Sequence, residues 1–379
     1  MYRRSKFLPL LLTLILLTGC VPTKEIETLA IINAYGVDIA EDNPEQLDVT
    51  SIVLQFSDQA DSITQTLSGT GSTIREAFQS TGSKTSFYPH PGQIRLVLYG
   101  KETAQNGILP YLNTLVRDSR VSEMLYPAVS NTTAKELLTT RQESTGIDIA
   151  QHLQGIIEKE IKENSIPDVS FYHFNRVHQS SGEDPMLPLI GIKENKPELI
   201  GMALLRDTKY VGDISLDDAF LVNLFRKNIH DKPFNISLPK EPFSQYMEDP
   251  QDEEEKLNID LLITDGRSNT KLTDVDQPRF QINITLEANL FETSEEMEIK
   301  NEHVFNLLEK EIKKEIESQY EELLINLQEV NSDPFGLGKL YRVHKENGTL
   351  TPEEWHEKFP DAVVDFNVDV ELTNYGTIQ

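Results

Sequence analysis

Residues 280–290 read Phe-Gln-Ile-Asn-Ile-Thr-Leu-Glu-Ala-Asn-Leu, so that every even position is apolar and every odd position except 287 carries an uncharged polar side chain, Glu287 being acidic. Successive side chains of a strand point to opposite faces, so this pattern predicts a strand with one face on a core and the other in solvent. Residues 364–372 repeat it, with Val, Phe, Val, Val and Leu on the even positions. The two stretches predict two strands of one half-buried sheet.

A long amphipathic helix is predicted between these strands, over residues 303–330. Its apolar stripe recurs every four residues at Val304, Leu308, Ile312, Ile316 and Tyr320. The helix should end at Asn331-Ser332-Asp333-Pro334, because proline cannot continue it. The simplest assembly is an antiparallel sheet backed by this helix, in a C-terminal domain of residues 273–379.

Strand and helix patterns alternate in the rest of the chain. Apolar runs at 29–34, 47–56 and 94–99 predict strands, and helices are expected from about residue 73 and over 102–118, 133–140 and 148–162. Prolines between 167 and 197 indicate a looser stretch and a domain edge, followed by a strand block at 199–205 and 209–212. We therefore predict an α+β (mixed α/β) fold of three consecutive domains, 20–195, 196–272 and 273–379, with small sheets packed by helices.

The first twenty residues have the three parts of a secretory signal peptide. Arg3, Arg4 and Lys6 precede an apolar run at 7–17, and small residues come before Cys20. Leu17-Thr18-Gly19-Cys20 matches the bacterial lipobox, so we expect cleavage after Gly19, removal of residues 1–19, and a diacylglyceride on Cys20. The alternatives are a plain secreted protein with a chance cysteine and a short uncleaved anchor, although 7–17 is too short to span a bilayer.

The amino-acid composition argues against disulfide bonds and against several kinds of partner. Cys20 is the only cysteine, so the chain can form no internal disulfide. Its 62 acidic and 35 basic residues give a net charge of −27. Nucleic acid is therefore not expected as a partner, because binding it requires phosphate neutralisation by lysine and arginine. Adsorption to anionic lipid is disfavoured for the same reason, which leaves the lipid on Cys20 to hold the protein at a membrane.

No reaction centre is evident. The sequence lacks Gly-x-Ser-x-Gly and the phosphate-binding loop with its lysine. Of the eight histidines, His173 and His178 are the closest pair, but they are expected in a proline-flanked loop and lack the spacing of a helical zinc pair. Gly69-x-Gly71 before a helix could hold an anion, but a tight strand-to-helix loop is the simpler interpretation. We predict no catalytic residue, no cofactor and no metal, with Trp355 near Phe359 anchoring a core.

Several blocks together resemble one family. They follow the lipobox in order, at residues 25–38 (Glu-Ile-x-x-Leu-Ala-x-x-x-Ala-x-Gly-Val-Asp), 69–77, 96–100, 200–212 and 333–338, with His90, Arg117-Asp118, Gln328 and Trp355. These blocks resemble the Ger(x)C lipoproteins, the C subunits of nutrient germinant receptors in endospore-forming bacteria. One departure is Val21-Pro22 after the cysteine, where the family often has Trp-Asp.

The resemblance implies a three-domain mixed α/β protein on the outer surface of the spore inner membrane. It would work with two integral membrane partners, an A and a B subunit, so that nutrients trigger germination. The resemblance supplies no catalytic residue, and Cys20, as the lipidation site, is the one position with known chemistry. A lipid-anchored solute-binding protein of a transporter is the alternative, and such proteins have two similar lobes around a cleft. A surface hydrolase is a third class, which needs a constellation this sequence does not display.

Overall fold

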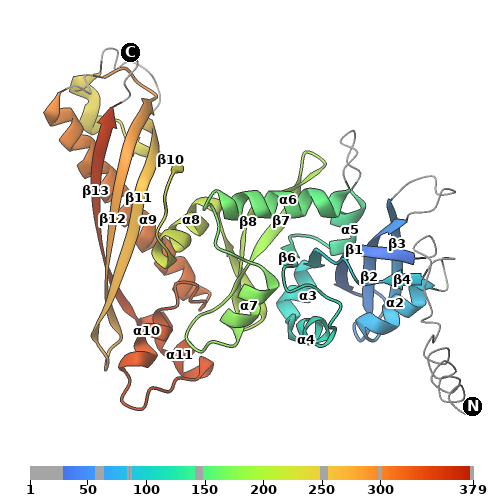
Figure 1. The fold of residues 1–379 in the computed structure, drawn as a ribbon. Coiled ribbons are helices and arrows are strands. Elements are labelled where there is room, and N and C mark those ends of the chain that lie inside the picture. The colour runs from blue at the N-terminus through green and yellow to red at the C-terminus, as the bar shows by residue number, and fades with distance from the viewer. Residues whose placement is uncertain are drawn as a thin grey trace, which may run out of the picture.

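The computed structural model describes residues 29–55, 64–82, 85, 88–140, 148–247, 255–297 and 301–375. These residues form two β-sheets, of nine and four strands, that follow one another along an elongated molecule (Figure 1). Cys20 and residues 248–254 of the acidic run lie outside the described residues. The mixed α/β fold class is confirmed.

The first sheet has the order β3-β2-β1-β5-β6-β7-β8-β9, and β4 pairs with β1. Pairing is antiparallel among β1, β2 and β3, parallel from β1 through β5 and β6 to β7, and antiparallel again through β8 to β9. The strands are β1 (Leu29–Ile39), β2 (Leu47–Gln55), β3 (Thr64–Gly71), β4 (Tyr88–His90), β5 (Leu96–Tyr99), β6 (Tyr126–Ser130), β7 (Met186–Lys193), β8 (Lys196–Arg206) and β9 (Lys209–Ile214).

Helices cover both faces of this sheet, which is why its central parallel strands β5 and β6 are buried throughout. One face carries α2 (Ile74–Gly82), α3 (Lys101–Asn106), α4 (Leu109–Arg117) and α7 (Phe171–His178). The other face carries α5 (Ala134–Thr139) and α6 (Ile149–Lys162). The single helix expected over 102–118 is wrong: it is broken into α3 and α4 at Gly107, whose φ is +110°.

The stretch between residues 167 and 197 is not the loose segment that its prolines suggested. It holds α7 and β7, and Leu187 and Ile190 of β7 are fully buried. Pro188 lies in β7, and the pairs between β7 and β6 are at Leu189 and Ile190, in the middle of β7. Its missing N–H therefore interrupts no pair with β6, and the proline does not break the strand.

The second sheet has the order β10-β11-β12-β13, with strands β10 (Lys232–Pro239), β11 (Lys256–Asp274), β12 (Arg279–Thr293) and β13 (Val363–Tyr375). The helix α9 (Glu302–Glu329) packs on it, as the sequence predicts, and the even residues of 280–290 are all buried. Smaller helices are α8 (Leu216–Arg226), α10 (Leu337–His344) and α11 (Pro352–Lys358), with 3₁₀ turns η2 (Glu241–Tyr246) and η3 (Phe359–Asp361).

The expectation of a wholly antiparallel C-terminal sheet is wrong for its last pair. Phe280 pairs with Val364 and Leu286 with Val370 in a parallel register. The chain leaves β12, runs along α9, and returns through α10 and α11 to the end at which β12 began (Figure 1). A crossover of this kind produces parallel neighbours, whereas an antiparallel pair needs only a short hairpin.

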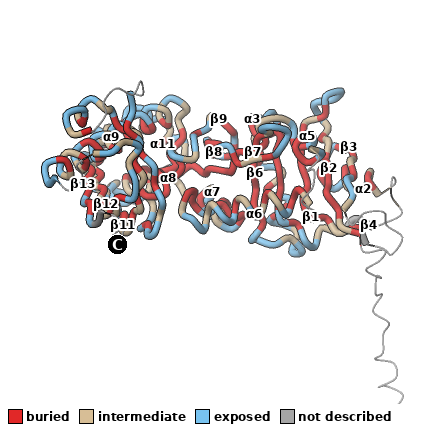
Figure 2. The backbone as a smooth tube through the Cα atoms, turned by 90° about the horizontal axis from the view of Figure 1, so that it is seen from above, coloured by how far each residue is buried: buried red, intermediate tan, exposed pale blue. Residues whose placement is uncertain are grey.

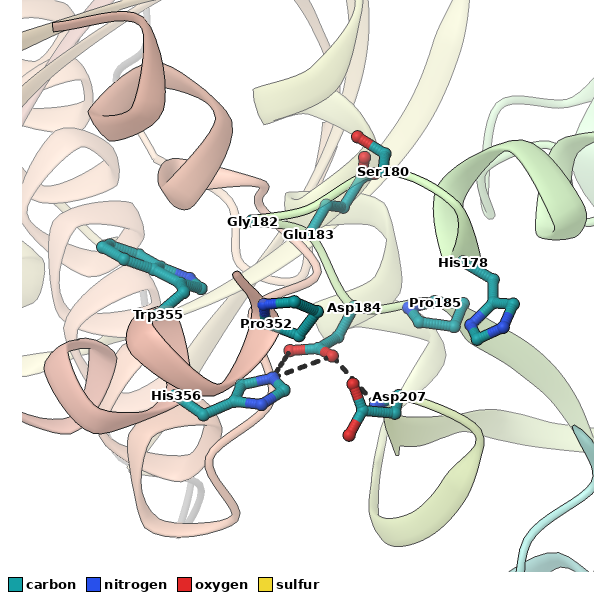
Figure 3. Close-up of a pocket in the computed structure, with 10 residues that line it drawn as sticks. All are labelled: His178, Ser180, Gly182, Glu183, Asp184, Pro185, Asp207, Pro352, Trp355 and His356. Atoms are coloured by element: carbon teal, nitrogen blue, oxygen red, sulfur yellow. Dashed lines mark hydrogen bonds and ion pairs between the residues drawn. The ribbon is translucent and has the colours of Figure 1, made fainter. Parts of the chain in front are cut away.

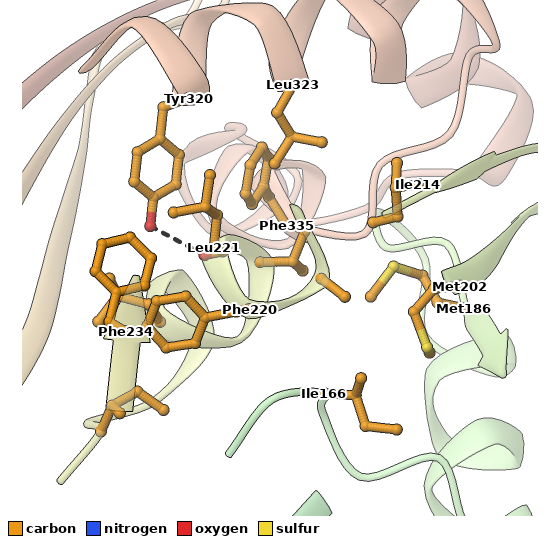
Figure 4. Packing of buried hydrophobic residues seen from close by; sticks show 14 of the residues in the cluster. Ile166, Met186, Met202, Ile214, Phe220, Leu221, Phe234, Tyr320, Leu323 and Phe335 are labelled. Carbon is orange, nitrogen blue, oxygen red and sulfur yellow. Dashed lines mark hydrogen bonds between the residues drawn. The ribbon is translucent and has the colours of Figure 1, made fainter. Parts of the chain in front are cut away.

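One apolar core joins the two sheets. Helix α8 lies between them, and buried residues continue from β7 and β8 through α8 to α9 (Figure 2). Phe220 of α8 contacts Phe234 of β10, and the Tyr320 hydroxyl donates a hydrogen bond of 3.0 Å to the Leu221 carbonyl (Figure 4).

Hydrogen-bonded strands also cross both expected domain boundaries. The hairpin of β7 and β8 spans residue 195, and β11 spans residue 272. The three-domain division itself stays a prediction. None of the helices in the described ranges combines the length and the apolar character needed to cross a bilayer.

Candidate functional site

Two loops from distant parts of the chain meet where the sheets adjoin. One runs from Gly182 to Pro185, between α7 and β7, and the other from Asn331 to Gly336, between α9 and α10. Asp184 N–H donates to the Asp333 carbonyl at 2.9 Å, and Lys339 N–H donates to the Gly182 carbonyl at 3.0 Å. Asp184 and Asp333, which are 149 positions apart, are thus joined by a main-chain hydrogen bond. We call this contact the junction.

Glycine allows the junction to close. A Cβ on Gly338 would lie 2.6 Å from the Gly182 Cα, and one on Gly182 would lie 2.4 Å from the Gly338 carbonyl carbon. Gly182 also has a φ of +89°, which side chains rarely adopt. The two backbones can therefore approach this closely only because neither residue carries a side chain.

Asp333 is the buried centre of the junction and has no exposed surface. Its carboxylate accepts hydrogen bonds from Gly336 N–H at 2.9 Å, Gly338 N–H at 3.1 Å and the Trp355 indole at 2.9 Å. Burial nevertheless raises the pKa of Asp333 to about 7, since loss of water outweighs the three donors. The carboxyl group can therefore change charge near neutral pH.

Asp184 connects Asp333 to His356 of α11. Its Oδ2 accepts from Asp333 N–H at 2.9 Å. The same Oδ2 lies 2.9 Å from His356 Nε2, and Oδ1 accepts from Asp207 N–H at 3.1 Å (Figure 3). Burial by itself would lower the pKa of His356. The hydrogen bond and negative charge of Asp184 outweigh burial and raise that pKa above its ordinary value of 6.5.

Three of these side chains have the composition of a metal site. Ligand atoms of Asp184, Asp207 and His356 all lie within 4.8 Å of one another. However, each Asp184 oxygen already has two nitrogen donors, so its accepting capacity is used. A cation would have to displace the His356 proton and break main-chain contacts. The donor set therefore fits a hydrogen-bonded contact better than an ion.

Glu183 adds a second ionic contact beside the first. Its carboxylate, 1% exposed, pairs with Arg226 at the end of α8 at 2.5 Å and with Lys339 of α10. Arg226 also lies 3.1 Å from His173 Nε2. Burial, together with the charge of Arg226, lowers the pKa of His173 to about 4. Separating a buried ion pair is costly, because it leaves a buried charge without its partner. These charges therefore fix the relative position of α8, α10 and the Glu183 loop.

The junction holds few of the residues that the sequence singled out. Cys20 lies outside the described residues. His173 and His178 lie on α7 rather than in a loop, and they contact Arg226 and Phe174 respectively. Trp355 is confirmed as a core anchor, with its ring 5.9 Å from that of Phe359.

Gly69 and Gly71 lie on β3 rather than in the loop after it. A Cβ at Gly69 would be 2.3 Å from the Ala77 carbonyl oxygen, so this glycine lets α2 pack closely on the strand. Sequence reasoning missed Asp184 and His356, and it interpreted Asp333 as part of a helix stop and of a family block rather than as a buried charge. The sequence did contain a signal for the two carboxylates, because Asp184 and Asp333 each stand directly before a proline and after a small or polar residue.

Comparison with known proteins gives consistent matches along the chain. Residues 22–192 match the family model of the spore germination protein N-terminal domain, and residues 200–376 match that of the spore germination B3/GerAC-like C-terminal region. Spore germination protein GerQC of Bacillus cereus is 24% identical over 378 residues, covering 99% of this chain and 100% of that protein. Spore germination protein B3 of Bacillus subtilis is 21% identical, covering 99% and 98%.

The crystal structure of the GerBC protein has a similar fold. It superimposes with a TM-score of 0.57 at 16% identity, covering 92% of this chain and 100% of that one. The family blocks, the fold and the relatives agree, and they support a role in spore germination. The chain belongs to the Ger(x)C family of spore germination proteins.

Proposed function

We propose that this protein is a lipid-anchored, non-enzymatic subunit of a nutrient germinant receptor, required for germination in response to nutrients. The observation that carries the proposal is the position of the family matches, which begin at residue 22, two residues after the lipobox cysteine Cys20. Its partners would be the integral membrane A and B subunits. Its location would be the outer face of the spore inner membrane.

The lipid on Cys20 would hold the first sheet near the bilayer. Residues 21–28 separate Cys20 from the start of β1 at Leu29. Even a fully extended segment of that length reaches only about 28 Å. The part of the first sheet where β1 begins would therefore lie close to the membrane partners, and the second sheet would point away from the membrane.

Contacts at the junction support a non-enzymatic role. Asp184 and His356 are engaged with each other and with the main chain. The alternative of a transporter's solute-binding protein is disfavoured, because that class has two similar lobes and these two sheets differ in strand number and order.

The first experiment replaces Cys20 with alanine at the native locus and measures germination as loss of spore refractility against a panel of nutrients. We expect a defect with some nutrients only, normal vegetative growth, and loss of the protein from the membrane fraction. Cys20 is the only cysteine, so the substitution removes the lipid site without touching a disulfide.

A deletion strain and an immunoblot complete the design. The immunoblot separates loss of anchoring from loss of protein. If the deletion strain, freed of paralogous receptors, germinates normally with every nutrient, the proposal fails.

A further inference from the structure

A cavity of about 570 Å³ lies on the first sheet, far from the junction. Helix α2 packs on β2, β3 and β4, whereas α3, which leads directly into α4, packs on β9, β1 and β6. The residues that line the cavity come from β1, from α2, from the end of α4 and from the loop after α4, so the cavity lies between α2 and α4. Its volume is that of a pocket for one small molecule, since such sites measure roughly 300–1,000 Å³.

The floor of the cavity is apolar and rigid. Ile32 and Tyr35 of β1 and Ile94 before β5 line it, and each is at most 3% exposed. Phe78 of α2 stands against Tyr35 in an edge-to-face contact with ring centroids 5.4 Å apart. An apolar group entering the cavity would therefore meet a preformed surface.

Three arginines surround this floor, Arg75 on α2, Arg117 at the end of α4, and Arg120 in the loop that follows. Asp118 is the one acidic side chain in the lining. It is already taken by Arg120, whose Nε and Nη2 donate to its two oxygens at 2.8 and 2.6 Å. The cavity thus carries two more positive charges than negative ones.

Arg75 and Arg117 have no ion pair or side-chain hydrogen bond with any residue in the described part of the chain. The hydrogen bonds from Arg120, with a contribution from the charge of Arg75, hold the pKa of Asp118 at about 2. Two unpaired arginines at one cavity contrast with a chain in which acidic residues outnumber basic ones by 62 to 35.

We propose that this cavity binds a small organic anion with an apolar body. Arg75 and Arg117 would hold the carboxylate or phosphate, because the guanidinium fork matches the geometry of both groups. The apolar body would lie over Ile32, Tyr35 and Phe78. This inference goes beyond the proposed receptor role and does not depend on it.

The test uses the full-length protein in nanodiscs of zwitterionic lipid and isothermal titration calorimetry. The probes are 4-phenylbutyrate and the uncharged 4-phenyl-1-butanol, which share an apolar body and differ in the carboxylate. We expect saturable binding of 4-phenylbutyrate, at least ~10-fold tighter than binding of the alcohol, as hydrogen bonds to charged groups imply.

Three variants in the same discs separate the parts of the site. Arg75→Ala combined with Arg117→Ala should weaken 4-phenylbutyrate binding at least ~10-fold and leave the alcohol within ~3-fold. Gln79→Trp fills the cavity from an exposed lining position and should abolish binding of both probes. Arg267→Ala removes an exposed arginine of β11 and should change neither.

Two results would overturn the proposal: no saturable binding of 4-phenylbutyrate, or binding that the arginine double variant leaves unchanged. Discs that also contain phosphatidylglycerol distinguish the two sources of such an anion. Competition by the anionic lipid assigns the site to a headgroup, and lack of competition assigns it to a soluble molecule.

Discussion

At the scale of single residues, the junction brings together two groups whose pKa values are raised in the folded protein. Asp333 has its pKa raised to about 7 by burial, and His356 has its pKa raised above 6.5 by Asp184. Each group binds protons more tightly in the folded protein than in the unfolded chain. The contribution of each group to the free energy of unfolding is therefore largest at low pH and decreases as the pH rises.

His356→Gln tests this sign directly. The charged contact with Asp184 is fully present below pH 6.5 and is lost as pH rises through the raised pKa of His356. We expect the variant to be about 1–2 kcal/mol less stable than the wild type near pH 5.5, with a difference that shrinks above neutrality. Urea unfolding at several pH values, followed by fluorescence of Trp355, measures it, since Trp355 is the chain's one tryptophan.

Exposed His344 of α10 is the matched control, and His344→Gln should alter stability little at each pH. The groups facing His356 are Asp184, Asp207 and, more distantly, Arg206. A stability difference for His356→Gln that grows with pH would contradict the assigned direction.

Why the junction was not predicted also becomes clear at this scale. Asp184 and Asp333 are 149 positions apart, and no local pattern links them. Trp355 could be assigned to a core from its residue type, but its hydrogen bond to Asp333 depends on where α11 packs. Periodicity reports which face of an element is buried, and it does not report which loops meet.

At the scale of elements, the packing of α10 against the Gly182 loop depends on a missing side chain. A Cβ on Gly338 would approach the Gly182 Cα to 2.6 Å and the Trp355 ring to 2.8 Å. Gly338→Ala should therefore destabilise the protein by about 1–3 kcal/mol, the usual cost of overpacking.

Gly155→Ala in α6 is its matched control and should have the opposite sign. Nothing lies within 4 Å of the added Cβ there, so a stabilisation of about 0.5–1 kcal/mol is expected from the better helix former. Thermal unfolding of both variants is the measurement. If both substitutions destabilised the protein, the loss at Gly338 could not be attributed to the close contact of its added Cβ.

Helix α9 protects the open edge of the second sheet through two carboxylates. Glu317 accepts from Val368 N–H at 3.0 Å, and Glu309 accepts from Leu372 N–H at 2.9 Å. Eight helical residues rise about 12 Å. Four strand residues rise about 13 Å. The spacings match, so one helix face caps two unpaired donors of β13.

Glu317→Ala should leave the Val368 N–H without its partner and lower the free energy of unfolding by about 1–2 kcal/mol. Glu317→Gln keeps an acceptor and should lose less. Exposed Glu321→Ala on the same helix is the control, with little expected change. Slower hydrogen exchange at Val368 in the alanine variant than in the wild type would contradict this role.

At the scale of the whole molecule, one core joins both sheets through α8. Phe335 is 4% exposed, and its ring lies 4.8 Å from that of Phe225 in α8 and 6.4 Å from that of Tyr320 in α9. Phe335→Ala should cost about 3–5 kcal/mol. The urea midpoint of unfolding should fall, and it should fall to the same value whether unfolding is followed by Trp355 fluorescence or by far-ultraviolet circular dichroism. Two separate transitions would instead favour independently folding domains.

The sequence was sufficient for most elements and insufficient for their assembly. Alternation at 280–290 predicted β12, alternation at 364–372 predicted β13, and the four-residue stripe of 304–320 predicted α9, because one buried face dictates each pattern. The parallel direction of β13 depends on how the crossover returns, which no local pattern records. The cavity over β1 is equally invisible, since it arises from the separation of α2 and α4.

The parallel crossover also determines when β12 can acquire its partner strand during synthesis of the chain. Strand β12 ends at Thr293, and its partner β13 does not begin until Val363. During synthesis the edge of β12 therefore stays open until residues beyond 363 have been made, and non-local pairing of this kind is slow. A chain halted before residue 363 presents that edge to any neighbouring strand, so the pairing of β13 with β12 protects this protein from aggregation.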